Sequence, residues 1–372
     1  MNQQEIITAL ERSLVTLQER KKCEAIGRAV LEKQETPDIA VSRASLNQQL
    51  LNQQIGVQHT MSLRIIEPTE TINVEHPIFL LFGQPGVGKS SLGFSAENAI
   101  LLNFDTEAAI ARTVNRGRSI NVLGLEELRE FESGSPLLDP FSTIVIDPVG
   151  SCVNLMALDI VEKNPKYGRD GSLTLQGYGV LKSRFRTWMT RLRAMQKNIL
   201  LVAHHKEDKN GDNVFVRPDI TGSSCDEVMR LSDFVGFLYM SGKQRMLDFN
   251  PTESWFGKNP AQWPAWKVPA PEHARTFMAQ LFQKGRESLS KASEASASVA
   301  QQVMDWQSAI ESYTRIEEFN RAVPDIRGLN ATLQPQVAKL IRTRAKACGF
   351  EYDVDRKVFY VVEPVKETVM AL

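Results

Sequence analysis

Short continuous runs of apolar residues alternate with helical patterns through the middle of the chain. The clearest runs are Ile78–Phe82, Thr143–Ile146 and Ile199–Ala203. A strand that is apolar at every position is typical of a parallel sheet whose two faces are both covered by helices. The pattern therefore predicts an α/β fold with a mostly parallel sheet.

The two ends of the chain carry other patterns. Over residues 1–58, apolar residues recur at helical spacing among many Gln and Glu residues, which predicts a helical N-terminal extension. The α/β core is expected over 59–287. The Ser- and Ala-rich stretch 288–304 is interpreted as a linker or a weak helix, and 305–372 as a small C-terminal α/β domain.

A glycine-rich segment follows Ile78–Phe82 directly. Gly83 to Ser90 read GQPGVGKS, which matches the pattern GxxxxGK(S/T) between a strand and a helix. Glycines let backbone N–H groups turn inward and hold phosphate oxygens. Lys89 would contact the β- and γ-phosphates, and Ser90 would give a hydroxyl ligand to Mg²⁺. A chance glycine-rich turn is the alternative, but it does not explain why every position of the pattern agrees.

Two other apolar runs end in carboxylates. Asp147 ends one of them, where a protein with a phosphate loop needs an acid to hold Mg²⁺, directly or through water. The other ends in Asp105-Thr106-Glu107, and Glu107 could orient the water that attacks the γ-phosphate. The alternative is a helix N-terminus, with Asp105 as its cap and Glu107 in its first turn. The residues predicted to bind ATP are Gly83, Gln84, Pro85, Gly86, Val87, Gly88, Lys89, Ser90, Ser91 and Asp147. Ser90 and Asp147 are the predicted Mg²⁺ ligands, and Lys89 and Glu107 are predicted to be catalytic.

The Asp-x-Glu strand end, between the phosphate loop and the Asp147 strand, resembles the RecA family of recombinase ATPases. A closer resemblance is to the compact RecA-like ATPases of bacteriophages, described as phage nucleotide-binding or AAA-family proteins; it covers about residues 60–285. This resemblance implies a RecA-like core, ATP hydrolysis and assembly of identical subunits into a ring or filament. For some of these proteins it also implies ATP-linked annealing of single-stranded DNA.

The same resemblance suggests two more site features. RecA-like proteins have a polar γ-phosphate sensor at a strand end, and His205, or its neighbour His204, would take that place. The alternative is that both are ordinary polar residues at a strand end. The resemblance also implies a cation donated to the ATP of the neighbouring subunit. Lys243 and Arg245 are the main candidates and Lys258 is another, against the alternative of a surface hairpin with ordinary charges.

A local excess of basic residues lies between Glu162 and Arg193, with tyrosines and glycines among them. Basic charge with interleaved aromatic residues is typical of loops that bind single-stranded nucleic acid, and in RecA-like proteins the loop after the Asp147-type strand faces DNA. The alternative is the solvent face of an ordinary helix. The residues predicted to contact single-stranded DNA are Lys163, Lys166, Tyr167, Arg169 and Lys182.

Composition adds few constraints. Lys plus Arg and Asp plus Glu both total 44, so net charge does not favour a polyanionic partner. The 4 cysteines lie far apart, which argues for reduced thiols rather than disulfides or a zinc site. No stretch resembles a signal peptide or a membrane span. A soluble protein of a bacterial or phage-infected host cytosol is expected, with no membrane contact.

The favoured function is ATP binding and slow hydrolysis coupled to assembly on single-stranded DNA, for annealing or strand pairing, with a recombination or replication protein as partner. Two alternatives stay open. One is an AAA-type ATPase that loads or remodels such a protein; the other is a nucleotide-switched scaffold with little turnover. Against the first, AAA proteins usually carry the catalytic acid beside the Asp147-type residue, where this chain has Pro148.

Overall fold

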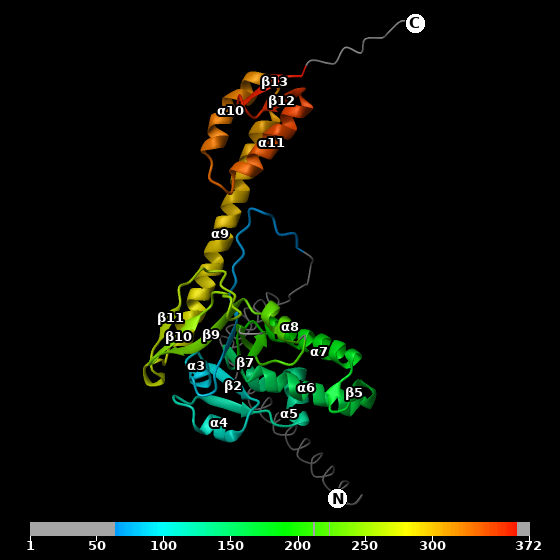
Figure 1. Cartoon of the computed structure of the whole chain (residues 1–372), viewed down its shortest axis with the longest axis vertical. Coiled ribbons are helices and arrows are strands. Elements are labelled where there is room, and N and C mark those ends of the chain that lie inside the picture. The colour runs from blue at the N-terminus through cyan, green and yellow to red at the C-terminus, as the bar shows by residue number, and fades with distance from the viewer. Residues whose placement is uncertain (1–63, 211–212, 223, 363–372) are drawn as a thin grey trace, which may run out of the picture. The chain divides into compact units, whose positions relative to one another are not determined.

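The computed structural model describes residues 64–210, 213–222 and 224–362 (Figure 1). Within them, a sheet of nine strands forms the centre of the core, in the order β11-β10-β9-β1-β7-β4-β2-β3, with β8 paired to β7. The strands are β1 (Ile78–Gly83), β2 (Ala99–Asn103), β3 (Arg118–Asn121), β4 (Thr143–Asp147), β7 (Asn198–Asn210), β8 (Asn213–Pro218), β9 (Phe234–Ser241), β10 (Gln244–Asp248) and β11 (Trp266–Val268).

Most of this sheet is parallel. β1 pairs in parallel with β7 on one side and β9 on the other, and β4 and β2 continue the parallel order towards β3. β10 and β11 extend the other end of the sheet as antiparallel strands. The predicted α/β fold with a mostly parallel sheet is therefore confirmed. β7 lies between β1 and β4, so the carboxyl ends of these three strands meet at one edge.

Helices cover both faces of the sheet, and β1 shows why its residues are all apolar. Ile78, Leu80 and Phe82 pack on one face with α6 and α7, whereas Phe79 and Leu81 pack on the opposite face with α3 and the start of α9. The helices of the core are α3 (Lys89–Gly93), α4 (Glu107–Ala111), α5 (Leu125–Gly134), α6 (Val149–Lys163), α7 (Leu175–Ala194) and α8 (Ser224–Leu231). A two-stranded hairpin, β5 (Gly168–Arg169) and β6 (Ser172–Leu173), connects α6 to α7.

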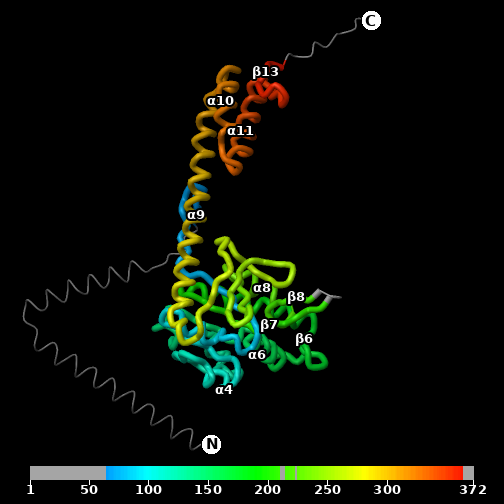
Figure 2. The backbone as a smooth tube through the Cα atoms, turned by 60° about the vertical axis from the view of Figure 1, so that its left-hand side comes forward, coloured from blue at the N-terminus to red at the C-terminus, as the bar shows by residue number. Residues whose placement is uncertain are grey.

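The stretch between the core and the C-terminal domain is one continuous helix, α9 (Phe277–Glu311) (Figure 2). Residues 288–304 lie wholly inside it, so of the two sequence interpretations the helical one is observed. The reason is local: alanine is the strongest helix former, and no glycine or proline interrupts the chain between Gly285 and Glu311. The predicted N-terminal extension, 1–58, lies outside the described residues.

The C-terminal domain has its own hydrophobic core. It consists of the end of α9, α10 (Ile316–Gly328), α11 (Gln334–Ala347) and the hairpin β12 (Phe350–Asp353) and β13 (Val358–Val361). Its core is centred on Phe319 of α10, Val337 and Ile341 of α11 and Phe359 of β13. The sequence predicts a small α/β domain over 305–372, and α10, α11, β12 and β13 lie within that range. Among the described helices, none is long and apolar enough to cross a membrane.

Candidate nucleotide-binding site

The phosphate loop, Gly83–Ser90, leaves β1 at the edge where parallel strands end. Beside it lies a cavity of about 600 Å³, lined by residues of the loop and by side chains from β4, β7 and the turn after β2. Gly86 and Gly88 have φ angles of 80° and 95°, a region that residues with a Cβ rarely adopt. At Gly88, a Cβ would lie 2.4 Å from an Nη atom of Arg245. Gly86 and Gly88 are therefore required by the conformation of the loop.

Lys89 is buried at the centre of this site. Its ammonium group donates hydrogen bonds of 2.8 Å to the backbone carbonyls of Gly83 and Gln84. Burial lowers the pKa of Lys89 to about 8, an effect that the nearby carboxylate of Asp147 partly opposes. Burial therefore makes the charged form of Lys89 less favourable in the free protein. A bound anion would stabilise that charged form.

The lowered pKa of Lys89 leads to a pH-dependent affinity for ATP. An anionic triphosphate favours the charged lysine, so its pKa rises on binding. Below pH 8 the lysine is already charged; above it, binding must take up a proton. We expect the affinity to fall by up to tenfold for each pH unit between about 8 and 10. Calorimetric titration with ATP in buffers of different ionisation heat measures both the affinity and the proton uptake.

The matched control for this titration is Lys89→Met, which keeps a long apolar side chain but cannot titrate. Its residual affinity should vary little over the same pH range. A parent protein whose affinity for ATP is constant between pH 7 and 10, with no proton uptake, would contradict the prediction.

Asp147 ends β4 and faces the same cavity. Burial is the main reason that its pKa is raised, although a hydrogen bond from Ser90 and the charge of Lys89 act in the opposite direction. Its Oδ2 atom is buried and has no hydrogen-bond partner among the described residues. A buried carboxylate oxygen without a partner lowers the stability of the folded protein, unless a cation binds to it. Carboxylate and hydroxyl oxygens are ligands that Mg²⁺ prefers, so Ser90 and Asp147 fit that ion.

The two histidines lie in the middle of β7, where its parallel pairing with β1 ends and its pairing with β8 begins, and not at the strand end that the sequence predicts. His204 pairs in register with Gly83 and lines the cavity, and burial, followed by the charge of Lys89, lowers its pKa. His205 does not line the cavity; its Nε2 lies 3.8 Å from the carboxylate of Glu207. Side chains alternate along a strand, so only one of two neighbours can face the site. Of the two histidines that the sequence offers as a phosphate sensor, His204 therefore faces the cavity and His205 does not.

The two acids that follow β2 also differ in whether they face the cavity. Asp105 lines the cavity, whereas Glu107 is exposed and does not. α4 begins at Glu107, with Thr106 as its N-cap, and the Glu107 carboxylate accepts a 3.2 Å hydrogen bond from Asn121. The helix start turns this side chain away from the phosphate loop. Of these two acids, Asp105 is the one that lines the cavity, and the cap of α4 is Thr106 rather than Asp105, which the sequence analysis offered as a helix cap in the alternative.

The three candidate cations for a neighbouring subunit differ in their accessibility. Arg245 is buried and donates a hydrogen bond of 3.3 Å to the carbonyl of Val87 and another to that of Pro269, and burial lowers its pKa. It therefore supports the phosphate loop of its own chain, which corrects the prediction of a role across a subunit boundary. Lys258 donates to the carbonyl of Ser232 at 2.6 Å. Lys243 is exposed at the turn between β9 and β10.

The predicted DNA-contacting residues are only partly available. Lys163 is paired with the fully buried Asp159 at 2.8 Å, and Tyr167 is half-buried against the core. Lys166 and Arg169 are exposed around the β5–β6 hairpin, where Arg169 lies 3.4 Å from its neighbour Asp170. Lys182 on α7 is half-buried.

The basic excess around α7 is smaller in the fold than along the sequence. Arg184 of this helix pairs with Glu132 and with Asp159, and Arg186 pairs with Glu227. These acids come from α5, α6 and α8. All three lie outside the basic stretch, which is why the sequence suggests a larger basic surface than the fold leaves exposed.

A comparison with protein families agrees with the geometry of this site. A family model described as an AAA domain matches residues 75–261, half of the chain, and includes the whole phosphate loop and Asp147. No curated protein matches the chain. A KaiC-like protein of Pyrococcus horikoshii OT3 aligns with a TM-score of 0.31 and 12% identity, over 55% of this chain and 96% of that one. The flagellar accessory protein FlaH of Methanocaldococcus jannaschii aligns with a TM-score of 0.28 and 11% identity, over 47% and 77%. On the family match, joined to the phosphate loop and the acid opposite it, this chain belongs to the AAA-domain family of P-loop ATPases.

Proposed function

We propose that this chain binds ATP with Mg²⁺ at the phosphate loop and hydrolyses it. The observation that carries the proposal is the cavity into which both Lys89 and Asp147 face, since one offers a buried cation and the other an unpartnered carboxylate oxygen. Backbone N–H groups of Gly83–Ser91, other than at Pro85, would bind the phosphates. Lys89 would move from two backbone carbonyls to the β- and γ-phosphate oxygens.

Ser90 and Asp147 would hold Mg²⁺. When bound, the ion offsets negative charge on the phosphates. His204 is mainly neutral at pH 7 because its pKa is lowered, so it can donate one hydrogen bond to the γ-phosphate without adding charge. His204 lies where β7 stops pairing with β1, and the residues that follow it in β7 pair with β8, so His204 would link the state of the phosphate to that β7–β8 extension.

Hydrolysis also needs a group that orients the attacking water. If Asp105 or Glu107 does this, replacing that acid should lower kcat. Asp105 faces the cavity, so we expect Asp105→Asn to lower kcat by roughly 10² to 10⁴-fold with little change in the affinity for ATP. Glu107→Gln, which keeps the hydrogen-bonding shape beside Asn121, should stay within a few-fold of the parent. Steady-state phosphate release and calorimetric binding of ATP separate the two effects.

The reverse result would identify Glu107 as the catalytic acid, as the sequence resemblance implies. It would mean that the bond between Asn121 and Glu107 breaks when nucleotide binds. Loss of ATP binding in both variants would instead show that the two acids shape the cavity. Neither would then be assigned the role of orienting the attacking water.

We further propose that the chain works as a ring or filament acting on single-stranded DNA, in recombination of the phage type. Assembly would bring a cation to the neighbouring ATP, and Lys243 is the exposed candidate. Support for DNA contact comes from Lys166 and Arg169, which remain exposed around the β5–β6 hairpin, with Lys182 on the adjoining helix. These are fewer contacts than the sequence alone suggests.

ATP hydrolysis with and without single-stranded DNA tests this finer proposal. Stimulation by DNA supports the recombinase. Stimulation only by a replication or recombination protein would identify a loader, and negligible turnover a nucleotide-switched scaffold. In the stimulated case, the combined variant Lys166→Glu, Arg169→Glu, Lys182→Glu should remove the stimulation, while Arg186→Gln, which only breaks the pair with Glu227, should not.

A further inference from the structure

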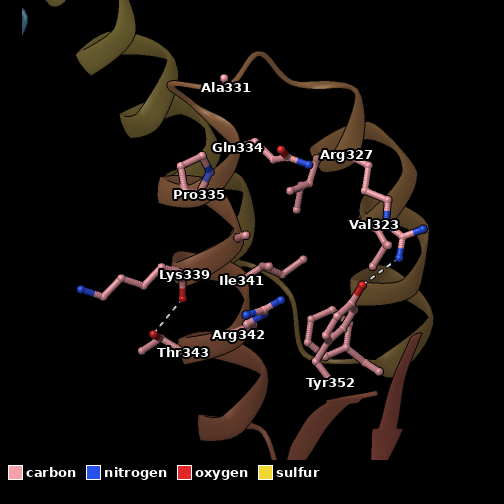
Figure 3. Close-up of a pocket in the computed structure, with 13 residues that line it drawn as sticks. Val323, Arg327, Ala331, Gln334, Pro335, Lys339, Ile341, Arg342, Thr343 and Tyr352 are labelled. Atoms are coloured by element: carbon pink, nitrogen blue, oxygen red, sulfur yellow. Dashed lines mark hydrogen bonds between the residues drawn. The ribbon is translucent and has the colours of Figure 1, made fainter. Parts of the chain in front are cut away.

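The C-terminal domain contains a second cavity, far along the chain from the phosphate loop. It has a volume of about 720 Å³ and lies between the end of α10, the first half of α11 and the hairpin (Figure 3). Three cationic side chains, Arg327, Lys339 and Arg342, line it together with Tyr352, and no acidic residue does. Its volume falls in the range of pockets that receive ligands, roughly 300–1,000 Å³.

Charge is segregated strongly around this cavity. Between Asp325 and Glu351 the sequence contains Arg327, Lys339, Arg342, Arg344 and Lys346, and no acid. The acids of the domain lie in the segments on either side of this stretch. Lys339 and Arg342 are exposed on one face of α11, and Arg327 is exposed at the end of α10. Like charges that gather without intervening acids repel one another, so this arrangement favours an anionic partner.

Two of the three cations are already held in place by one tyrosine. Arg327 donates a 2.8 Å hydrogen bond to the hydroxyl of Tyr352, and the guanidinium of Arg342 lies 4.9 Å from the centre of the same ring (Figure 3). Among the described residues none of the three cations forms an ion pair, so their charge is not neutralised within this part of the chain. A guanidinium oriented in advance loses less conformational freedom when it binds phosphate oxygens.

The walls between these cations are apolar and small. Ala331 and Pro335 are exposed, Ala338 is half-buried, and Ile341 and Phe359 close the floor. An unpaired strand presents phosphates and bases together, so it can place charge on the arginines and bases on the small apolar wall. A duplex exposes base edges only inside its grooves, and a recessed cavity is poorly shaped to enter them. An acidic peptide would also match the charge of the cations. Guanidinium groups bind carboxylate and phosphate alike, so nothing in their chemistry favours the peptide.

We propose that this cavity of the C-terminal domain is a binding site for single-stranded DNA, with Arg327, Lys339 and Arg342 contacting its phosphates. It is separate from the surface of Lys166, Arg169 and Lys182 on the core. The biological role of this site rests on the proposed action on single-stranded DNA. Its ability to bind a strand rests only on the cations and the apolar wall of the cavity. It gives the chain two sites for one strand, which raises the effective concentration of DNA at the core.

The test uses the full chain and a fluorescently labelled oligothymidine, with dissociation constants measured by anisotropy between 50 and 400 mM NaCl. The variant Arg327→Gln, Lys339→Gln, Arg342→Gln should bind more weakly at low salt, and the slope of log K against log salt should be flatter by about 2, because three phosphate contacts are lost. The matched control, Arg321→Gln, Arg356→Gln, Lys357→Gln, removes the same charge from the same domain outside the cavity and should keep the parent slope.

A parent slope in the cavity variant would overturn the proposal. So would equal affinity for a duplex of matched length, or displacement of the oligonucleotide by polyglutamate at equal charge, which would indicate an acidic protein. Should the triple variant fail to fold by circular dichroism, Lys339→Glu replaces it, since the Lys339 side chain lies exposed on α11. Its slope should be flatter by about 0.7, because one phosphate contact is lost. ATP hydrolysis with and without DNA is measured in parallel. Its absence from the parent under both conditions would refute the proposed ATPase function while leaving the cavity result to stand.

Discussion

Lys89→Ala is expected to abolish measurable ATP hydrolysis and to weaken ATP binding by roughly 10² to 10⁴-fold. The ammonium group is buried in the phosphate loop and has two hydrogen bonds that a triphosphate would replace. Each hydrogen bond between a charged donor and phosphate contributes about 1.5–3 kcal/mol, and two such bonds give the expected range. Calorimetric titration with ATP and Mg²⁺ measures the loss of affinity, and phosphate release measures the loss of turnover.

The control for Lys89→Ala must show that the loop still folds, because the carbonyls of Gly83 and Gln84 lose their donor. Thermal unfolding without nucleotide tests this, and Lys89→Met offers a variant that fills more of the space. Lys267→Ala removes an exposed lysine elsewhere in the core and should bind ATP as the parent does. If Lys89→Ala bound ATP like the parent, the nucleotide site would lie outside this cavity and the ATPase proposal would fail.

Much of the fold follows from local patterns in the sequence. Runs such as Ile78–Phe82 are apolar at every position because both faces of β1 are covered, and that is visible without a structure. The order of the strands is not visible in the same way. β7 inserts between β1 and β4, although β4 precedes it in the chain, because pairing depends on contacts between distant segments.

Some residues of the candidate site could likewise be identified from the sequence, and others could not. Lys89, Ser90 and Asp147 could be identified because a short motif and a strand end fix their positions. The choice between His204 and His205 depends on which face of β7 meets the cavity, and a shift of one residue reverses it.

Arg245 shows what the sequence could not reveal at all. Its burial depends on Val87 and Pro269, which lie in other parts of the chain. The same holds for the arginines of α7, whose acidic partners come from neighbouring helices. Whether a cation is free or paired is a property of tertiary structure, so basic surfaces are harder to predict than phosphate loops.

Asp147→Asn is expected to have two opposite effects, a gain in the stability of the free protein and a loss of ATP hydrolysis that depends on Mg²⁺. Burial raises the pKa of Asp147, so the charged form is penalised in the folded state, and Oδ2 has no partner among the described residues. An amide removes that penalty at neutral pH. As the pH falls through the raised pKa, the parent carboxyl becomes neutral and the advantage of the variant should shrink.

Thermal unfolding at pH 5 and pH 8, with and without ATP and Mg²⁺, measures both effects. We expect the variant to unfold at a higher temperature than the parent at pH 8, to differ less at pH 5, and to gain little from added Mg²⁺ with ATP. Its kcat should fall by at least about 10²-fold, since an amide is a poor substitute for a carboxylate ligand. Asp139→Asn, at an exposed acid, should change neither property. A variant that was less stable at both pH values yet still stabilised by Mg²⁺ with ATP would contradict the prediction. It would show that Asp147 serves the fold rather than the ion, because a buried carboxylate that lacks its cation should destabilise the free protein.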